Sequence, residues 1–181
     1  TAVTNLLGVI EEMDELMKVR FVEVFEKISE EFKVVFKKLF KGGEGILELT
    51  DPEDILNTGI EISALPPGKK LNSIALLSGG EKTLTAISLL FAILNVKPVP
   101  FVELDEVEAA LDQGNVERFA RYLKTFSDQT QFIVVTHRPG TMEQCDVLYG
   151  VTMQKQGVSQ MLKVELSDAK ELADESEGTA A

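Results

Sequence analysis

The sequence is poor in cysteine, in positive charge and in long apolar runs, and each shortage narrows the class of protein. The single cysteine, Cys145, cannot form an internal disulfide, which favours a cytosolic setting. No run of about eighteen or more uncharged apolar residues occurs, so no helix is expected to cross a membrane. The first residues have neither an initiator Met nor the segments of a signal peptide, so we expect a fragment without a leader.

Positive charge is scarce, because 18 Lys and Arg stand against 30 Asp and Glu and give a formal net charge of −12. Phosphate contacts need clustered Lys and Arg, so this segment is not expected to bind nucleic acid by itself. Residues 167–181 are small, polar and acidic. We interpret this tail as flexible, or as a peptide that another protein orders.

The length, the hydrophobic content and a periodic first segment indicate one compact domain with a long helix at its start. The 181 residues, of which 44% are hydrophobic, are enough for a sizeable core. From Val3 to Phe40, apolar residues recur every three or four positions with charges between them, which predicts an amphipathic helix. Its length fits either a coiled-coil arm that leaves the domain or a long surface helix, and the pattern leaves both open.

The rest of the chain predicts an α/β fold in two parts. Gly42-Gly43 end the helix, and turn residues then separate three short antiparallel strands, expected at 45–49, 59–64 and 71–76. Helices and apolar strands alternate afterwards, which is typical of a parallel sheet covered on both faces. These are a helix at 81–95, a strand at 98–104, a helix at 115–126 and a strand at 131–136. Two final strands, at 147–153 and 159–165, are expected to close the domain.

The first candidate site lies between an apolar strand and a helix, at Ser78-Gly79-Gly80-Glu81-Lys82. The two glycines let the backbone approach an anion, and the helix N-terminus offers unpaired N–H groups with a positive dipole end. Together with the Ser78 hydroxyl, these groups predict a phosphate cradle. The alternative is a plain loop in which Ser78 caps the helix.

The second candidate site is the end of the apolar strand Phe101–Glu106, where two neighbouring carboxylates follow a buried stretch. Such groups at the carboxyl end of a parallel strand point into the crevice where ligands bind. Asp105 can hold Mg²⁺, usually through water, while Glu106 orients an attacking water. A solvated acidic strand end is the alternative.

Two further residues follow along the chain. Asp112, in Ala110-Leu111-Asp112, is expected by default to cap the next helix. His137, the only histidine, stands at the end of a second apolar strand, at the same sheet edge as the acidic pair. A neutral imidazole there can hydrogen-bond a phosphate oxygen or the attacking water, although a lone histidine is more often structural.

In this order the four features resemble the second half of an ATP-binding-cassette (ABC) nucleotide-binding domain. The matches are Leu77–Lys82 with the signature motif, Val99–Glu106 with the Walker B strand, Ala110-Leu111-Asp112 with the D-loop and His137 with the switch histidine. The resemblance implies that Ser78 binds the γ-phosphate of ATP held by another head. It also implies that Asp105 serves Mg²⁺, that Glu106 polarises water and that His137 senses the γ-phosphate.

The local sequence is similar to that of bacterial SMC (structural maintenance of chromosomes) heads, from about Phe21 to Leu166. The similar segments are Pro66–Lys70, Leu76–Lys82, Leu104–Asp112 and Val135–Arg138. Glu81 stands where transporter cassettes usually have Gln. The resemblance implies an α/β C-terminal head lobe at 41–166, preceded by the end of a coiled-coil arm at 1–40 and followed by the tail at 167–181.

The same resemblance implies an ATPase that uses ATP and Mg²⁺ in chromosome condensation and segregation. Its expected partners are the N-terminal SMC head lobe, a second SMC head in a homodimer, a kleisin subunit and, through the assembled complex, DNA. A cytoplasmic, nucleoid-associated location without membrane contact is implied as well. Two alternatives remain, namely a head lobe of a related DNA-repair ABC ATPase and a kleisin-docking module without activity of its own.

The final strands, 147–166, are the expected kleisin surface. Resemblance places the C-terminal winged-helix domain of the kleisin on this end of some SMC heads. The turn at Gln156-Gly157 also exposes a strand edge, which partners commonly extend. The alternative is that these strands merely close the sheet.

Two features depart from the family pattern. No Gly-x-x-x-x-Gly-Lys-Ser/Thr loop occurs, so the chain is not expected to hold ATP by itself. In SMC proteins that loop lies in the N-terminal lobe. Glu103 stands where the family has an aliphatic residue, and a charge inside a core strand is costly unless it is paired. The packing around Glu103 is therefore a question for the structure.

Overall fold

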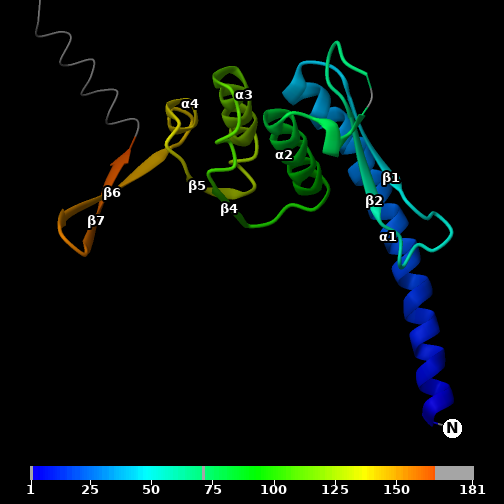
Figure 1. The fold of residues 1–181 in the computed structure, drawn as a ribbon. Coiled ribbons are helices and arrows are strands. Elements are labelled where there is room, and N and C mark those ends of the chain that lie inside the picture. Colours follow the sequence, from blue (N-terminus) through cyan, green and yellow to red (C-terminus); the bar gives the residue numbers. More distant parts are fainter. Residues whose placement is uncertain (1, 71, 166–181) are drawn as a thin grey trace, which may run out of the picture.

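The computed structural model describes residues 2–70 and 72–165, and the acidic tail expected at 167–181 lies outside the described residues. A long helix leads into a three-stranded meander, then into two parallel strands with their helices, and finally into a hairpin (Figure 1). The elements are α1 (Ala2–Phe40), β1 (Glu44–Leu49), β2 (Ile60–Leu65), β3 (Asn72–Ser73), η1 (Ile74–Leu76), α2 (Gly79–Val96), β4 (Phe101–Asp105), α3 (Gln113–Lys124), β5 (Gln131–Val135), α4 (Pro139–Met142), β6 (Val147–Lys155) and β7 (Val158–Glu165). Within the described part of the chain, no helix is long and apolar enough to cross a membrane.

Helix α1 is a stalk at one end and part of the core at the other. Its last turns pack against α2 and β1 and bury Phe32, Val35 and Phe36 completely. Its first turns extend away from the rest of the chain and carry exposed apolar side chains, among them Leu6 and Met13 (Figure 1). One end therefore packs as a domain helix. The exposed apolar stripe at the other end is compatible with the end of a coiled-coil arm.

The helix ends where the sequence places its two glycines. Lys41, Gly42 and Gly43 all have positive φ, and the Gly42 N–H donates to the Lys37 carbonyl at 2.9 Å. A Cβ on Gly43 would lie 2.1 Å from the carbonyl oxygen of Leu65, so only glycine fits where the chain turns against β2. This turn sends the chain back along α1 as strand β1.

Strands β1, β2 and β3 form an antiparallel meander, as expected. The register runs from Glu44 opposite Leu65 to Leu49 opposite Ile60, and Ser63 then pairs with Ser73. The strand expected at 71–76 is wrong beyond Ser73, because the apolar run that follows forms the turn η1 instead. The Leu77 N–H closes this turn by donating to the Ile74 carbonyl at 3.3 Å, which directs the chain into α2.

The two parallel strands are joined through α3 and packed on the helices. Phe101 to Asp105 of β4 pair in order with Gln131 to Val135 of β5. Phe91 of α2 is fully buried, and its ring stacks on Phe126 with centroids 5.1 Å apart and meets Tyr122 edge-on at 5.0 Å. This aromatic cluster joins α2 to the end of α3. Phe126 also meets Phe132 of β5 edge-on, with ring centroids 6.4 Å apart, so the cluster reaches the sheet.

One face of this sheet is open, which corrects the expectation of cover on both faces. Leu104 points inward and is 4% exposed, whereas Phe101 is 61% exposed on the opposite face, and Ile133 and Val135 of β5 are exposed with it. Glu103 lies on that open face too. The desolvation cost expected for Glu103 does not arise in this lobe, because its side chain alternates outward with the strand period.

Among the described residues, strands β6 and β7 pair only with each other and do not extend the β4–β5 sheet. Val151 lies opposite Met161, and Gly150 lies opposite Leu162, so neighbouring pairs alternate between the two faces. Val151, Met161 and Leu162 are all exposed. The hairpin therefore presents apolar side chains on both faces, and the expectation that it closes the domain is not met by the described residues.

Candidate functional site

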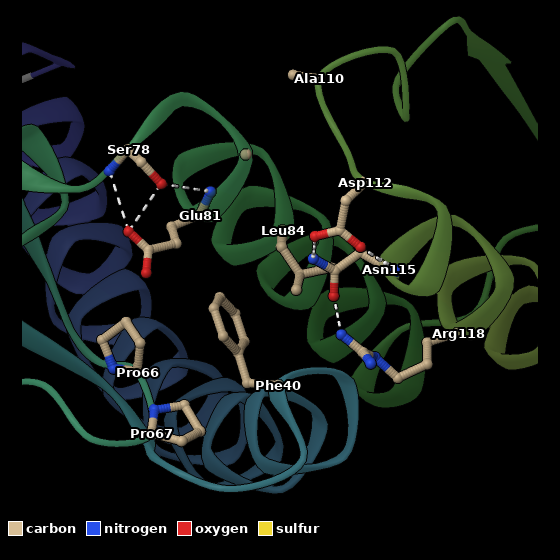
Figure 2. Close-up of a pocket in the computed structure, with 11 residues that line it drawn as sticks. Phe40, Pro66, Pro67, Ser78, Glu81, Leu84, Ala110, Asp112, Asn115 and Arg118 are labelled. Atoms are coloured by element: carbon tan, nitrogen blue, oxygen red, sulfur yellow. Dashed lines mark hydrogen bonds between the residues drawn. The ribbon is translucent and has the colours of Figure 1, made fainter.

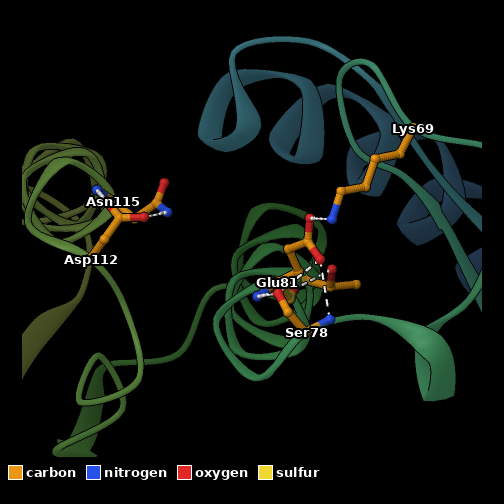
Figure 3. Close-up of polar contacts among 6 residues, drawn as sticks. Lys69, Ser78, Glu81, Asp112 and Asn115 are labelled. Carbon is orange, nitrogen blue, oxygen red and sulfur yellow. Dashed lines mark hydrogen bonds and ion pairs between the residues drawn. The ribbon is translucent and has the colours of Figure 1, made fainter.

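Ser78 opens helix α2 and is held by reciprocal hydrogen bonds with Glu81. The Ser78 hydroxyl accepts from the Glu81 backbone N–H at 3.4 Å. The Glu81 carboxylate accepts from the Ser78 N–H at 3.1 Å and from its hydroxyl at 2.8 Å (Figure 3). Ser78 is therefore the helix N-cap, as the alternative proposed. Capping is compatible with anion binding, because the N–H groups of Gly79 and Gly80 have no acceptor within the helix.

Lys69 completes this arrangement from the loop that follows β2. Its ammonium lies 2.7 Å from Glu81 Oε1, and the Glu81 side chain is only 20% exposed (Figure 3). The hydrogen bond from Lys69 holds the pKa of the Glu81 carboxyl below its ordinary value, and partial burial opposes that shift. Glu81 is therefore ionised at neutral pH. The sequence analysis noted Lys69 only as part of a similar segment, because the pairing spans twelve residues and no local pattern signals it.

The signature segment and the D-loop meet side by side. A Cβ on Gly80 would lie 3.0 Å from the Ala110 carbonyl oxygen, so the second glycine allows the close approach. Asp112 caps α3 by accepting from the Asn115 N–H at 2.9 Å, which confirms the default expectation for this residue. A hollow of about 410 Å³ lies between the two helix N-termini, with Phe40 on its wall (Figure 2).

Glu106 and His137 meet at the carboxyl ends of β4 and β5. His137 Nδ1 lies 3.2 Å from Glu106 Oε1, and both side chains are more than half exposed. Glu106 has a φ of 46°, a left-handed conformation that is uncommon outside glycine, and its N–H donates to the Val135 carbonyl at 2.9 Å. Backbone strain of this kind is concentrated at functional sites. The lone histidine is therefore placed beside the acidic pair, as the strand pattern predicts.

A buried carboxylate that the sequence analysis missed ties the D-loop to the histidine segment. Glu108 is fully buried and accepts hydrogen bonds from the hydroxyls of Thr136 and Thr141, the latter at 2.9 Å. Arg138 donates in turn to the carbonyl of Leu111. A buried carboxylate is costly unless it is hydrogen-bonded, so this network holds the two segments together. Its residues are spread over the chain, which hides the network from sequence reasoning.

No group of three or more potential metal ligands occurs among the described residues. Asp105 and Glu106 form a pair of neighbouring carboxylates at the open strand end, both exposed. Mg²⁺ is commonly held by one or two carboxylates, with phosphate oxygens and water completing its shell. The donor set therefore fits Mg²⁺ that arrives with a nucleotide.

The residues singled out from the sequence thus form two groups in the structure. One group is the signature segment with the D-loop, in which Lys82 donates its N–H to the Ser78 carbonyl at 2.9 Å and leaves its side chain exposed. The other group is the acidic strand end with His137. The side-chain hydrogen bonds of Ser78 go to Glu81, whereas the Glu106 side chain meets His137.

Three comparisons place the chain among known proteins. Residues 9–160 match the family described as the RecF/RecN/SMC N terminal domain. The chain is 61% identical over 170 residues to the chromosome partition protein Smc of Bacillus subtilis (strain 168), which covers 94% of this chain and 14% of that protein.

Solved structures with the same fold support this placement. One solved chain comes from a study of the structural biochemistry of ATP-driven dimerization and DNA stimulated activation of SMC ATPases. It superposes with a TM-score of 0.75 at 41% sequence identity, and the match covers 87% of this chain and 96% of that chain. The Smc head domain of Pyrococcus furiosus with an extended coiled coil, bound to the C-terminal domain of ScpA, has a TM-score of 0.83 at 41% identity, covering 95% and 43%.

The fold is that of the C-terminal lobe of an ABC-type ATPase head with the end of a coiled coil, and the acidic strand end beside a histidine is in keeping with it. The chain belongs to the RecF/RecN/SMC family, and it corresponds to part of a bacterial-type SMC head. It spans 13% to 18% of the length of the curated relatives reported to match it.

Proposed function

We propose that this chain is the C-terminal half of an SMC ATPase head that drives chromosome condensation and segregation. ATP joins two heads, and hydrolysis releases them. The observation that carries this proposal is the contact between Glu106 and His137 at 3.2 Å, at the open carboxyl edge of two parallel strands. That placement is where a water and a γ-phosphate would have to meet.

The missing half of the nucleotide site is supplied by an N-terminal lobe. The sequence has no Walker A loop, and the β4–β5 sheet leaves Phe101, Ile133 and Val135 exposed on one face. An open apolar sheet face of this kind marks an interaction surface. Glu103 lies on the same face, so the covering lobe is expected to bring a cation or a hydrogen-bond donor to it.

In the assembled head the residues of this chain have separate tasks. Glu106 orients the attacking water and accepts its proton, and His137 senses the γ-phosphate beside it. Asp105 would hold Mg²⁺, which supplies charge neutralisation at the phosphate oxygens. Ser78 and the first N–H groups of α2 bind the γ-phosphate of ATP on the second head, with the D-loop residues Ala110-Leu111-Asp112 beside them.

The contact with His137 and the left-handed backbone of Glu106 favour catalysis over a purely structural role for these motifs. A kleisin-docking module without activity would not need a strained acidic strand end. A partner nuclease in pull-downs of the full protein would instead favour the DNA-repair alternative.

The lobe alone is expected to bind ATP weakly or not at all and not to hydrolyse it. The reason is the absence of a Walker A loop from its sequence. Titration calorimetry of the purified chain with MgATP measures this directly. Micromolar binding by the chain alone would contradict the division of the site between two lobes.

The hairpin β6–β7 is the surface we propose for a kleisin subunit. The similar Smc head of Pyrococcus furiosus was solved bound to the C-terminal domain of ScpA. The hairpin of this chain is exposed on both faces, with paired strands whose outer edges are unpaired within the described chain. Adding a strand or a helix to such an edge is a common mode of recognition. The lobe itself carries a net charge of −12, which disfavours direct contact with DNA phosphates. The protein would therefore reach DNA through the assembled complex, at the nucleoid in the cytoplasm.

Charge changes at Gln154, Gln156 or Gln160 are expected to weaken binding of a kleisin C-terminal domain about tenfold and to leave the unfolding midpoint unchanged. Gln156 and Gln160 are exposed, and the side chain of Gln154 lies outside the described part of the structure. Surface plasmon resonance with the assembled head measures the affinity. Asp128→Lys, on the exposed loop after α3, is the control. Unchanged affinity of all the hairpin variants would place the kleisin elsewhere.

A further inference from the structure

We propose that Lys69 is a positioning residue for the signature segment. Lys69 neutralises and holds Glu81, so that the free N–H groups of the first turn of α2 can accept an anion. The proposal deepens the function proposed above and rests on it. Lys69 lies outside the motifs that define the nucleotide site, and it reaches them from the loop after β2 (Figure 3).

The geometry makes Glu81 the link between Lys69 and Ser78. One carboxylate oxygen, Oε1, lies 2.7 Å from the Lys69 ammonium. The other, Oε2, accepts from both the N–H and the hydroxyl of Ser78, at 3.1 and 2.8 Å. The two ends of the carboxylate are therefore occupied by different partners, and the position of the ammonium sets the direction in which Glu81 holds Ser78.

Charge gives this contact a function beyond positioning. A carboxylate in the first turn interacts favourably with the helix dipole and stabilises the helix. The same carboxylate repels a phosphate that approaches the N–H groups of that turn. Glu81 is four-fifths covered, so water screens its charge poorly. An ammonium 2.7 Å from Oε1 opposes the field of the carboxylate and so reduces its repulsion of an incoming anion. The N–H groups of the first turn of α2 are then better able to attract phosphate.

A turn closed by a backbone hydrogen bond brings Lys69 to this place. Pro66 is buried, Gly68 has a φ of 76°, and the Lys69 N–H donates to the Pro66 carbonyl at 3.1 Å. Lys70, the next residue, is exposed and takes part in none of the ion pairs among the described residues. The loop between β2 and β3 of the meander therefore contributes to the site, because it places Lys69, and not Lys70, beside Glu81 at the start of α2.

The experiment measures ATP-dependent head dimerisation in the assembled head, with Glu106→Gln to prevent turnover. Lys69→Met is expected to weaken the ATP-bound dimer about three- to tenfold, as for an ion pair within a network, and to leave the unfolding midpoint nearly unchanged. Lys69→Arg is expected to restore dimerisation to within about twofold, because the guanidinium can take the same place. Lys70→Met is the matched control and is expected to behave as the parent.

A double-mutant cycle separates action through Glu81 from a direct contact with nucleotide. Glu81→Gln keeps acceptor and donor atoms for the cap without the charge, so Lys69→Met is expected to add less than about twofold in that background. An equal effect of Lys69→Met in both backgrounds would overturn the proposal, as would a parent-like dimer with Lys69→Met alone. If the parent itself fails to dimerise with ATP, the proposed function fails, and this role falls with it.

Discussion

Glu106→Gln in the assembled head is expected to slow ATP hydrolysis by about 10²–10⁴-fold while ATP still binds, the usual contribution of a positioned general base. The amide can still hydrogen-bond a water, but it cannot accept the proton. Glu106 meets His137 at 3.2 Å and sits at the strand end with a φ of 46°, so its side chain is directed to one place. Single-turnover measurement of phosphate release separates this chemical step from binding.

ATP-bound dimers are expected to accumulate in the same variant, because the step that releases them is blocked. Size-exclusion chromatography with and without ATP detects them. Asp128→Asn is the matched control, since it also removes one exposed carboxylate but lies on the loop after α3. A turnover rate equal to that of the parent would remove Glu106 from the role of general base.

Ser78→Arg is expected to abolish ATP-dependent dimerisation and to leave ATP binding to the Walker A loop of the same head nearly intact. Ser78 is exposed at the start of α2, so an arginine fits in the free lobe. In the dimer it would put a bulky side chain where a small hydroxyl should meet the γ-phosphate of the other head. The readout is size-exclusion chromatography with ATP in the Glu106→Gln background, together with nucleotide affinity of the monomer.

Loss of the cap must be separated from this steric effect. Ser78 accepts from the Glu81 N–H, and replacing an N-cap serine costs about 1 kcal/mol of stability. Ser78→Gly keeps most of that stability without adding bulk, because glycine is tolerated at this position. Ser127→Arg, on the exposed surface after α3, controls for the added charge. A dimer that persists with Ser78→Arg would refute recognition of ATP in trans.

Much of the local structure followed from short-range rules. The period of apolar residues predicted α1. Ser78 and Asp112, both considered as caps, stand directly before α2 and α3, which begin two residues earlier than expected. Gly43 marked the end of α1 because only glycine tolerates that turn against Leu65. The meeting of His137 with the acidic pair was also predictable, since parallel strands bring their carboxyl ends to one edge.

By itself the sequence determined most of the elements, though not η1 or α4, together with their order and the residues with the chemistry of a phosphate site. Propensity, capping and strand alternation act over a few residues, which makes these features readable. Only the tertiary structure decided that one face of the β4–β5 sheet stays open and that Glu103 lies on it. It also decided that Lys69 pairs with Glu81 and that Glu108 is buried between Thr136 and Thr141. These contacts join segments far apart in the chain, and their distances depend on how helices and strands pack, which no local pattern encodes.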